Sequence, residues 1–360
     1  MNELPKRSGR DIVNLMFLPN NKCNFRCSYC YSAKGRSGKE VSLADMKKGI
    51  DYFFDMHKND NLPVSISVAG GGEPILSWNV MREALDYAYA KGEEQKKALP
   101  TCFITNGSIY TEEFAQYAYE HGFFLMISFD ILPDIQAKQR GHYDLVLSNI
   151  QRYIEKGISV AYSTVITAES VNRIEEMIDE IYNKTPDIKE VIFKTVISPD
   201  YFSTPAAYDE YLQAYKKNFF AAKEHAKNLG MNINVTGPFY NNTLGKTDRY
   251  CQPKFIITSE GTISLCPFAS SKQDVLYDEF AYGQITENGV TISQEKLSEL
   301  VAHNHDEKSK CKECIAYWYC AGGCYVNNLT IGEDYLNVYC KNMQLFVQYV
   351  LQKRKEDNSL

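Results

Sequence analysis

Residues 23–30 read Cys-Asn-Phe-Arg-Cys-Ser-Tyr-Cys, which places three cysteines in the spacing C-x3-C-x2-C. An apolar run at residues 12–18 precedes them and predicts a buried β-strand, so the cysteines fall on the loop that follows it. Three thiolates on one short loop can hold three irons of a four-iron cluster, and the fourth iron then stays open to another ligand. A zinc site is the alternative, although structural zinc sites usually combine two C-x2-C pairs across a long spacer. A third reading, three unrelated core cysteines, suits such a polar loop poorly.

The overall composition excludes several classes of protein. The chain has 360 residues, 44% hydrophobic and 23% charged, as expected of a globular protein with one large domain or a large and a small one. A net charge of −6 argues against a nucleic-acid partner. No apolar run approaches the roughly 18 residues of a membrane span, and the first ten residues do not resemble a signal sequence. We therefore expect a cytoplasmic protein with no membrane partner, whose 11 cysteines are reduced ligands rather than disulfides.

The first half of the chain alternates short apolar runs with amphipathic stretches. The apolar runs predict strands, and the amphipathic stretches predict helices between them. Six such repeats predict an α/β fold, a parallel sheet curved into a partial (β/α)6 barrel of the TIM type. In parallel barrels the chemistry lies at the carboxyl ends of the strands, where the cysteine loop also falls. The expected strands are 12–18, 63–69, 101–105, 123–129, 158–166 and 189–197, and the expected helices are 42–57, 78–91, 111–121, 142–156 and 170–183.

Local signals support several of these boundaries. We expect Ser42, Thr111 and Ser170 to cap helix N-termini, and Gly122 and Gly157 to follow helix ends. Residues 205–229 predict a long helix, the last of the barrel and the bridge to a second domain. Beyond it the sequence predicts one β-hairpin, at residues 255–258 and 262–265, and two helices, at residues 294–304 and 341–354.

Further motifs stand at the ends of the next three strands. The second strand runs into Gly70-Gly71-Gly72-Glu73-Pro74, the third into Thr105-Asn106-Gly107, and the fourth ends at Ser128-Phe129-Asp130, with Arg140 beyond it. Glycine lets a backbone approach a ligand closely. Taken alone, each motif is equally well read as a turn or as a polar cluster that caps the next helix.

Together these motifs resemble those of the radical S-adenosylmethionine (SAM) superfamily, whose signature is this C-x3-C-x2-C after the first barrel strand. The resemblance implies that Cys23, Cys27 and Cys30 hold a [4Fe–4S] cluster whose open iron chelates SAM. One-electron reduction then releases a 5′-deoxyadenosyl radical, and this chemistry belongs to the cofactor rather than to a side chain. The resemblance implies no catalytic side chain. It does imply a set of SAM-binding residues: Tyr29, Gly71, Gly72, Glu73, Ser128, Asp130 and Arg140.

A second group of cysteines occupies the last third of the chain in the pattern C-x9-G-x4-C, then C-x2-C-x5-C-x3-C, then C. This pattern resembles the SPASM domain of radical SAM enzymes at every position, with a zinc ribbon as the alternative. The resemblance implies domains at 1–230 for the barrel and 231–360 for a small SPASM domain with a β-hairpin and helices. It also implies two auxiliary [4Fe–4S] clusters, three clusters in all. The inner one has Cys251, Cys266 and Cys324, and the outer one has Cys311, Cys314, Cys320 and Cys340.

The inner cysteine set is one ligand short. Some relatives supply a fourth cysteine six residues before the first, where this chain has Gly245. The ligand could come from Asp248, Tyr250, water or the substrate.

Cys102 belongs to neither set and is expected in the core. The run Tyr317-Trp318-Tyr319 is read as packing, with an aromatic wall for a peptide as the alternative, and His225, His303 and His305 are read as helix-surface or helix-end residues.

The resemblance to the maturases implies oxidative modification of a ribosomally made peptide or a protein. We expect a SAM-dependent oxidoreductase that forms an intramolecular cross-link such as a thioether. Sulfatase-maturing relatives carry an aspartate base where this chain has Pro267, which puts their activity in doubt. A side-chain or small-molecule dehydrogenase is the alternative enzyme, and a zinc-stabilised interaction module is the alternative outside catalysis. A flavodoxin or ferredoxin is the expected electron donor. About a dozen residues precede the first strand, so leader recognition would need a separate protein or the barrel and SPASM surfaces.

Overall fold

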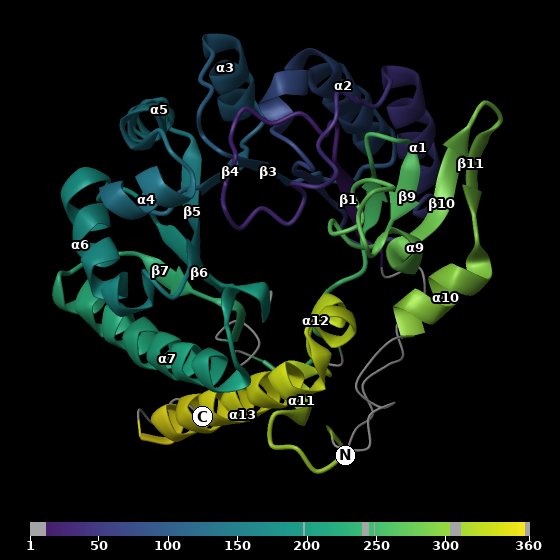
Figure 1. Ribbon diagram of the computed structural model, residues 1–360. Helices are drawn as coiled ribbons and strands as arrows, with labels where there is room; N and C mark the ends of the chain where they lie inside the picture. Colours follow the sequence, from purple (N-terminus) through teal and green to yellow (C-terminus); the bar gives the residue numbers. More distant parts are fainter. Residues whose placement is uncertain (1–11, 197–198, 240–244, 248, 303–310, 357–360) are drawn as a thin grey trace.

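The computed structural model describes residues 12–196, 199–239, 245–247, 249–302 and 311–356. Within these ranges a single curved sheet of eleven strands organises the molecule, in the order β11-β10-β9-β8-β1-β2-β3-β4-β5-β6-β7 (Figure 1). Neighbours from β1 to β7 are parallel, as the repeating pattern predicted. The strands are β1 Asn14–Phe17, β2 Ser65–Val68, β3 Thr101–Thr105, β4 Phe124–Ser128, β5 Ser159–Ile166, β6 Glu190–Thr195, β7 Asn234–Thr236, β8 Phe255–Ile257, β9 Thr262–Ser264, β10 Ala281–Thr286 and β11 Gly289–Ile292.

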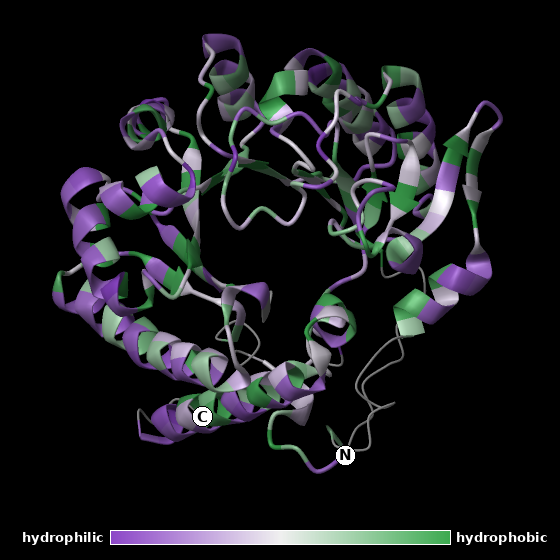
Figure 2. Cartoon of the chain, viewed as in Figure 1, coloured by the Kyte–Doolittle hydropathy of each residue, from purple (hydrophilic) through white to green (hydrophobic). Residues whose placement is uncertain are grey.

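Helices cover the outer face of the sheet, and their polar sides face outward (Figures 1 and 2). The barrel helices are α1 Leu43–Met56, α2 Trp78–Glu94, α3 Glu112–Glu120, α4 Pro133–Gln139, α5 Tyr143–Glu155, α6 Ile174–Lys184 and α7 Pro205–Asn228, with short 3-10 turns η2 Pro74–Ser77, η3 Val171–Arg173 and η4 Pro199–Tyr201. The later helices are α9 Tyr277–Phe280, α10 Gln294–Ala302, α11 Tyr317–Cys320, α12 Tyr325–Thr330 and α13 Gly332–Glu356, and α13 packs along α7. No helix in these ranges is long and apolar enough to cross a bilayer.

The strands bury opposite faces in two separate apolar clusters. Leu15 and Phe17 of β1 belong to the large core between sheet and helices. Met16 and Leu18 belong to a small cluster with Ala69 and Ile256. Because successive residues of a strand point to opposite faces, this small cluster lies on the inner face of the curved sheet.

Two of the three expected helix caps are confirmed. The Ser42 hydroxyl accepts from the Asp45 backbone N–H, and Thr111 accepts likewise from Phe114. Ser170 stands at the N-cap position of η3 but makes no capping hydrogen bond through its side chain, because its hydroxyl accepts from the Thr167 N–H instead. Gly122 and Gly157 follow α3 and α5 with positive φ, as expected.

The C-terminal hairpin does not form a sheet of its own. The predicted strands 255–258 and 262–265 appear as β8 and β9, which pair antiparallel. However, β8 also pairs in parallel with β1, so the hairpin extends the barrel sheet beyond its first strand. The hairpin β10–β11 then continues the sheet beside α1. The sheet therefore brings the second cysteine group towards the loop that follows β1.

Candidate functional site

The first three cysteines lie on the loop beyond the carboxyl end of β1, each half-buried. Burial raises the pKa of Cys27, and the three thiols lie close enough for the charges of Cys30 and Cys23 to raise it further. The loop is held against α4, where the Ser28 N–H donates to the Gln139 carbonyl at 2.9 Å. The structure therefore brings together the three thiols that the sequence predicted as a set.

The last cysteine of the loop has a different electrostatic environment. Arg36 donates from Nη2 to the Cys30 Sγ at 3.4 Å, and Ser32 Oγ lies at the same distance. Although burial raises the pKa of Cys30, these contacts bring it below its ordinary value. A guanidinium beside the three thiols stabilises their thiolate forms, which are the forms that bind a metal.

A buried polar network links the loop to β4. The Tyr29 hydroxyl donates to the Asp130 carboxylate at 2.8 Å, and Arg140 donates from Nη1 to the Tyr29 oxygen at 3.0 Å. Burial raises the pKa of Asp130 to about 6, and the Arg140 charge opposes this shift. Three of the residues expected to bind SAM thus meet directly. The fourth, Ser128, ends β4 at the same edge of the sheet, in register with Ser163.

The glycines after β2 let two backbones approach each other. A Cβ on Gly72 would come within 1.7 Å of the Lys22 carbonyl oxygen, and one on Gly71 within 2.4 Å of the Asn21 Oδ1. The Glu73 N–H donates to the same Lys22 carbonyl at 2.6 Å. In this structure the Gly-Gly-Glu segment therefore holds the chain that leads into the cysteine loop.

The Glu73 carboxylate accepts hydrogen bonds from three groups of the protein. It is buried, and it accepts from the Thr105 hydroxyl and the Asn106 N–H at 2.7 Å each and from the Ile75 N–H at 3.2 Å. Burial raises its pKa, although these hydrogen bonds oppose the rise. Glu73 thus joins the ends of β2 and β3. A SAM contact through its carboxylate stays a prediction.

One link in this region was not foreseen. The Asn106 amide donates to Asn24 Oδ1 at 2.9 Å, and the Asn24 amide donates to the Ser108 hydroxyl at 2.8 Å. These bonds tie the cysteine loop to the end of β3. The only sequence signal was an asparagine directly after Cys23, which by itself predicts nothing about its partner.

The second cysteine group also converges. Burial raises the pKa of Cys266 to about 12, and Cys324 and Cys251 raise it further. Cys251 also raises the pKa of Cys324, so the three thiols lie close together. Lys254 donates to the Cys251 Sγ at 3.4 Å. A separate pocket is lined by all four cysteines predicted as the outer set, together with Ala316, Tyr317, Gly322 and Met343. Both groupings are those that the resemblance to the SPASM domain implies.

Other predicted residues have less specific positions. Gly245 is exposed, while Asp248, His303 and His305 lie outside the described residues. Tyr250 lies beside Cys324, and burial raises its pKa. His225 of α7 pairs with Asp179 of α6 at 2.6 Å, a structural contact. In the described part of the chain, no three His, Cys, Asp or Glu side chains are arranged to hold a single metal ion.

The two cysteine groups face each other across an aromatic contact. Tyr31, directly after Cys30, stacks on Phe268, two residues after Cys266, with ring centroids 4.3 Å apart. A Cβ on Gly35 would come within 2.8 Å of Ser271, so the loop after Cys266 packs directly on the loop after Cys30.

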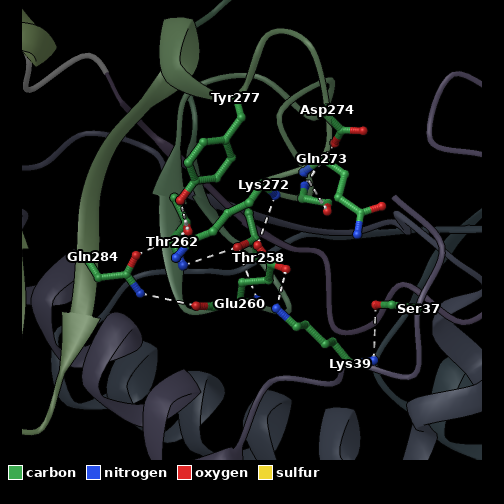
Figure 3. Close-up of polar contacts among 11 residues, drawn as sticks. Ser37, Lys39, Thr258, Glu260, Thr262, Lys272, Gln273, Asp274, Tyr277 and Gln284 are labelled. Atoms are coloured by element: carbon green, nitrogen blue, oxygen red, sulfur yellow. Dashed lines mark hydrogen bonds and ion pairs between the residues drawn. The ribbon is translucent and has the colours of Figure 1, made fainter. Parts of the chain in front are cut away.

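An ion pair fastens the same two loops farther out. Lys39 Nζ lies 2.7 Å from Glu260 Oε1, and the other Glu260 oxygen accepts from the Lys272 N–H at 3.0 Å (Figure 3). Gln284 of β10 donates to the Glu260 carbonyl at 3.1 Å. Glu260 thus holds the turn between β8 and β9 against the N-terminal loop.

Comparisons with known proteins agree with this geometry. Residues 17–181 match the radical SAM superfamily. Over 92% of its length the chain is 24% identical to a cysteine-type anaerobic sulfatase-maturating enzyme of Clostridium novyi (strain NT), covering 93% of that protein.

Two solved structures share the fold. One is anSMEcpe with bound AdoMet, with a TM-score of 0.73 and 18% identity, covering 95% of this chain and 98% of that one. The other is Streptococcus suis SuiB bound to S-adenosylmethionine, with a TM-score of 0.59 and 18% identity, covering 88% of this chain and 73% of that one. Residues 17–181 thus match the radical SAM superfamily, and nearly the whole chain is similar to the anaerobic sulfatase-maturating enzymes.

Proposed function

We propose that this enzyme uses SAM to oxidise a peptide or protein, and that Cys23, Cys27 and Cys30 hold the SAM cluster. The observation that carries the proposal is the facing of two cysteine groups across the Tyr31–Phe268 stack. When bound, the cluster and SAM supply a 5′-deoxyadenosyl radical that abstracts hydrogen from the substrate. An oxidation also needs an acceptor for the remaining electron, and an auxiliary cluster held by the nearby second cysteine group would be that acceptor.

The chain's own residues fit this cofactor chemically. Three thiols stand beside the guanidinium groups of Arg36 and Arg140, which offset the negative charge of thiolates. Arg140 is half-buried, and its Nε is enclosed without a hydrogen-bond partner among the described residues. We assign Arg140 to the SAM carboxylate and Ser128 and Asp130 to the ribose, with Tyr29, Gly71, Gly72 and Glu73 around the methionine end.

The second cysteine group would hold two auxiliary clusters. The four pocket-lining cysteines suit a closed outer cluster, because four thiolates can ligate all four irons. Cys251, Cys266 and Cys324 leave one iron of an inner cluster unassigned, and Gly245 cannot fill it. We assign the domains as 1–230 for the barrel and 231–360 for the cluster-binding part.

A peptide substrate is supported by relatives. The structures include anSMEcpe with Cp18Cys peptide and SuiB with the precursor peptide SuiA. Pro267 follows Cys266 directly and has no group that accepts a proton. This favours a cross-link over the oxidation performed by sulfatase-maturating enzymes. We propose a thioether between a substrate cysteine and a carbon of the same peptide, a two-electron oxidation that removes one C–H and one S–H hydrogen.

The substrate thiolate would complete the open inner site, because a metal ion deprotonates a bound thiol and ferric sites prefer thiolate. The test adds a cysteine-containing peptide and its Cys→Ser variant to an enzyme that lacks the first three cysteines. Only the cysteine peptide should change the auxiliary-cluster spectrum. A spectrum that responds to both peptides alike, or to neither, would rule out thiolate binding.

Metal analysis separates the enzyme from a zinc-stabilised module. After anaerobic reconstitution we expect iron with acid-labile sulfide, about twelve irons for three clusters. Zinc without sulfide would refute the enzyme.

Candidate substrates are small peptides encoded beside the gene. Co-expression and mass spectrometry should show a loss of two hydrogens for a cross-link. The same mass loss in a Cys→Ser peptide would favour the dehydrogenase instead.

A further inference from the structure

Each cysteine group contains one thiol that accepts a hydrogen bond from a cationic side chain. Arg36 Nη2 donates to the Cys30 Sγ at 3.4 Å, and Lys254 Nζ donates to the Cys251 Sγ at 3.4 Å. The two cations belong to different loops, and neither was singled out from the sequence. Neither has an ion pair with a carboxylate in the described part of the chain.

Arg36 is positioned by the backbone of the cysteine loop. Its Nη1 donates to the Phe25 carbonyl, so the guanidinium spans the loop from its first half to its last cysteine. Its Nε is enclosed and has no partner among the described residues. Cys23 and Cys27 also act on Arg36 electrostatically, so the charge faces all three thiols.

Arg36 is the effective donor to the sulfur. The other neighbour of Cys30 Sγ is the Ser32 hydroxyl, but it donates its one hydrogen to the Gly71 carbonyl at 2.7 Å. Both Ser32 and Arg36 lower the pKa of Cys30, and of the two only Arg36 carries a charge. A charged donor shifts the local charge balance far more than a neutral one.

Lys254 holds a similar position in the second group. Besides the Cys251 sulfur, its ammonium donates to the Gln252 carbonyl at 3.2 Å. Its charge also lowers the pKa of Cys266 and Cys324 against the effect of burial. The ammonium therefore faces all three members of the inner set.

We propose that Arg36 and Lys254 each raise the reduction potential of the adjacent cluster, Arg36 for the SAM cluster and Lys254 for the inner auxiliary cluster. The inference rests on the cluster assignments proposed above. Reduction adds one negative charge to a cluster, and a cation hydrogen-bonded to a ligand sulfur stabilises that charge. Arg36 would thus ease electron entry to SAM, and Lys254 would ease electron acceptance from the substrate.

The test is a potentiometric titration of the reconstituted full-length enzyme, followed by electron paramagnetic resonance. Adding SAM perturbs the signal of the SAM cluster alone and so identifies it. Arg36→Gln should lower the midpoint of that cluster by at least a tenfold change in its reduction equilibrium, 59 mV for one electron. Arg36→Lys should keep most of the potential. Lys254→Met should lower the midpoint potential of the inner auxiliary cluster and leave the midpoint potential of the SAM cluster unchanged.

Lys34→Gln is the matched control, because it removes an equal charge from an exposed position two residues away. Solvent screens that charge, so no shift is expected. Unchanged midpoints in Arg36→Gln with full iron content would overturn the proposal, as would equal shifts of both clusters in either variant.

A second neutral variant distinguishes a change in midpoint potential from a failure to bind the cluster. Arg36→Asn should shift the midpoint as Arg36→Gln does. Loss of iron in both neutral variants, with normal loading in Arg36→Lys, would show that the charge retains the cluster and would overturn the redox role. Failure of the wild-type chain to bind iron would instead refute the proposed function itself.

Discussion

The hydroxyl of Tyr29 lies 2.8 Å from both carboxylate oxygens of Asp130, although the two residues are 101 positions apart in the chain. The contact joins the residue before the last cysteine of the loop to the end of β4, and Arg140 binds the same hydroxyl at 3.0 Å. The three side chains form one buried unit, so a change in any of them should affect the other two.

Arg140→Lys should therefore weaken SAM binding at least tenfold while leaving iron content intact. Lysine keeps the charge but cannot hold a carboxylate with two parallel hydrogen bonds. Binding would be measured by calorimetry on the reconstituted enzyme. Arg152→Lys is the control, because the Arg152 guanidinium lies 3.5 Å from the centre of the Tyr110 ring, on a part of the chain remote from the cysteine loop. Equal SAM affinity in both variants would remove Arg140 from the SAM site.

Changing Cys23, Cys27 and Cys30 together to alanine should remove about a third of the iron and all SAM cleavage. The second group should still load, because its ligands lie on other segments. Iron and sulfide assays with a product assay for 5′-deoxyadenosine test this. A wild-type content near four irons would contradict the three-cluster assignment.

Glu73→Gln should lower the free energy of unfolding by about 1–3 kcal/mol, because it leaves buried donors unsatisfied. A glutamine amide has only one acceptor oxygen, and the Ile75 and Asn106 N–H groups donate to different oxygens of Glu73, so one of them would face the amide nitrogen. Glu113→Gln is the matched control, since its pair with Arg82 is on the surface and contributes about 1 kcal/mol or less. Equal unfolding midpoints in urea would show that Glu73 is not a structural link.

Asp60→Asn should destabilise the chain at neutral pH and matter less in acid. The Asp60 carboxylate accepts from Lys97 at 3.0 Å and lies 2.8 Å from His57 Nδ1. Although burial raises the pKa of Asp60, these partners lower it below its ordinary value. The stabilisation is then fully present above about pH 4 and is lost as the pH falls through the folded pKa.

Unfolding of the two iron-free chains at neutral and acidic pH measures this difference. The gap between wild type and Asp60→Asn should narrow as the pH falls. A gap that widens in acid would have the wrong sign for a lowered pKa.

Cys102 should resist alkylation in the folded enzyme. Burial raises its pKa to about 11, so at pH 8 roughly one thiol in a thousand is ionised. Iodoacetamide followed by peptide mass spectrometry should label Cys102 only after urea unfolding. Rapid labelling of the folded chain would place this cysteine in an open, polar environment.

Much of the barrel was predictable, because parallel strands buried on both faces give short continuous apolar runs. The prediction of residues 101–105 matches β3, and the other strand predictions run past the observed ends by one or two residues. The hairpin β10–β11 was missed because Ala281–Ile292 mixes polar and apolar residues without a clear period. Helix α13 begins at Gly332, nine residues before its predicted start.

The site was predictable in its ligands and less so in its supports. The spacing of the first three cysteines is a local property, whereas the two later sets were implied by the resemblance to the SPASM domain. Contacts such as Asn24 with Asn106 or Arg36 with Cys30 are made by loop residues, and they depend on the three-dimensional path of loops that have neither helical nor strand periodicity. No repeating pattern encodes these contacts, so sequence reasoning had no means to predict them.

The parallel pairing of β8 with β1 also governs the order in which a nascent chain can be completed. Strand β1 has β2 on one side and Phe255–Ile257 on the other, so one edge stays open until the ribosome has released the last third of the chain. Open strand edges recruit other chains, and slowly completed sheets aggregate through them. A product that stops near residue 250 would lose more than a set of cysteines. It would carry an unprotected edge next to the first cysteine loop, and we expect it to accumulate as insoluble material.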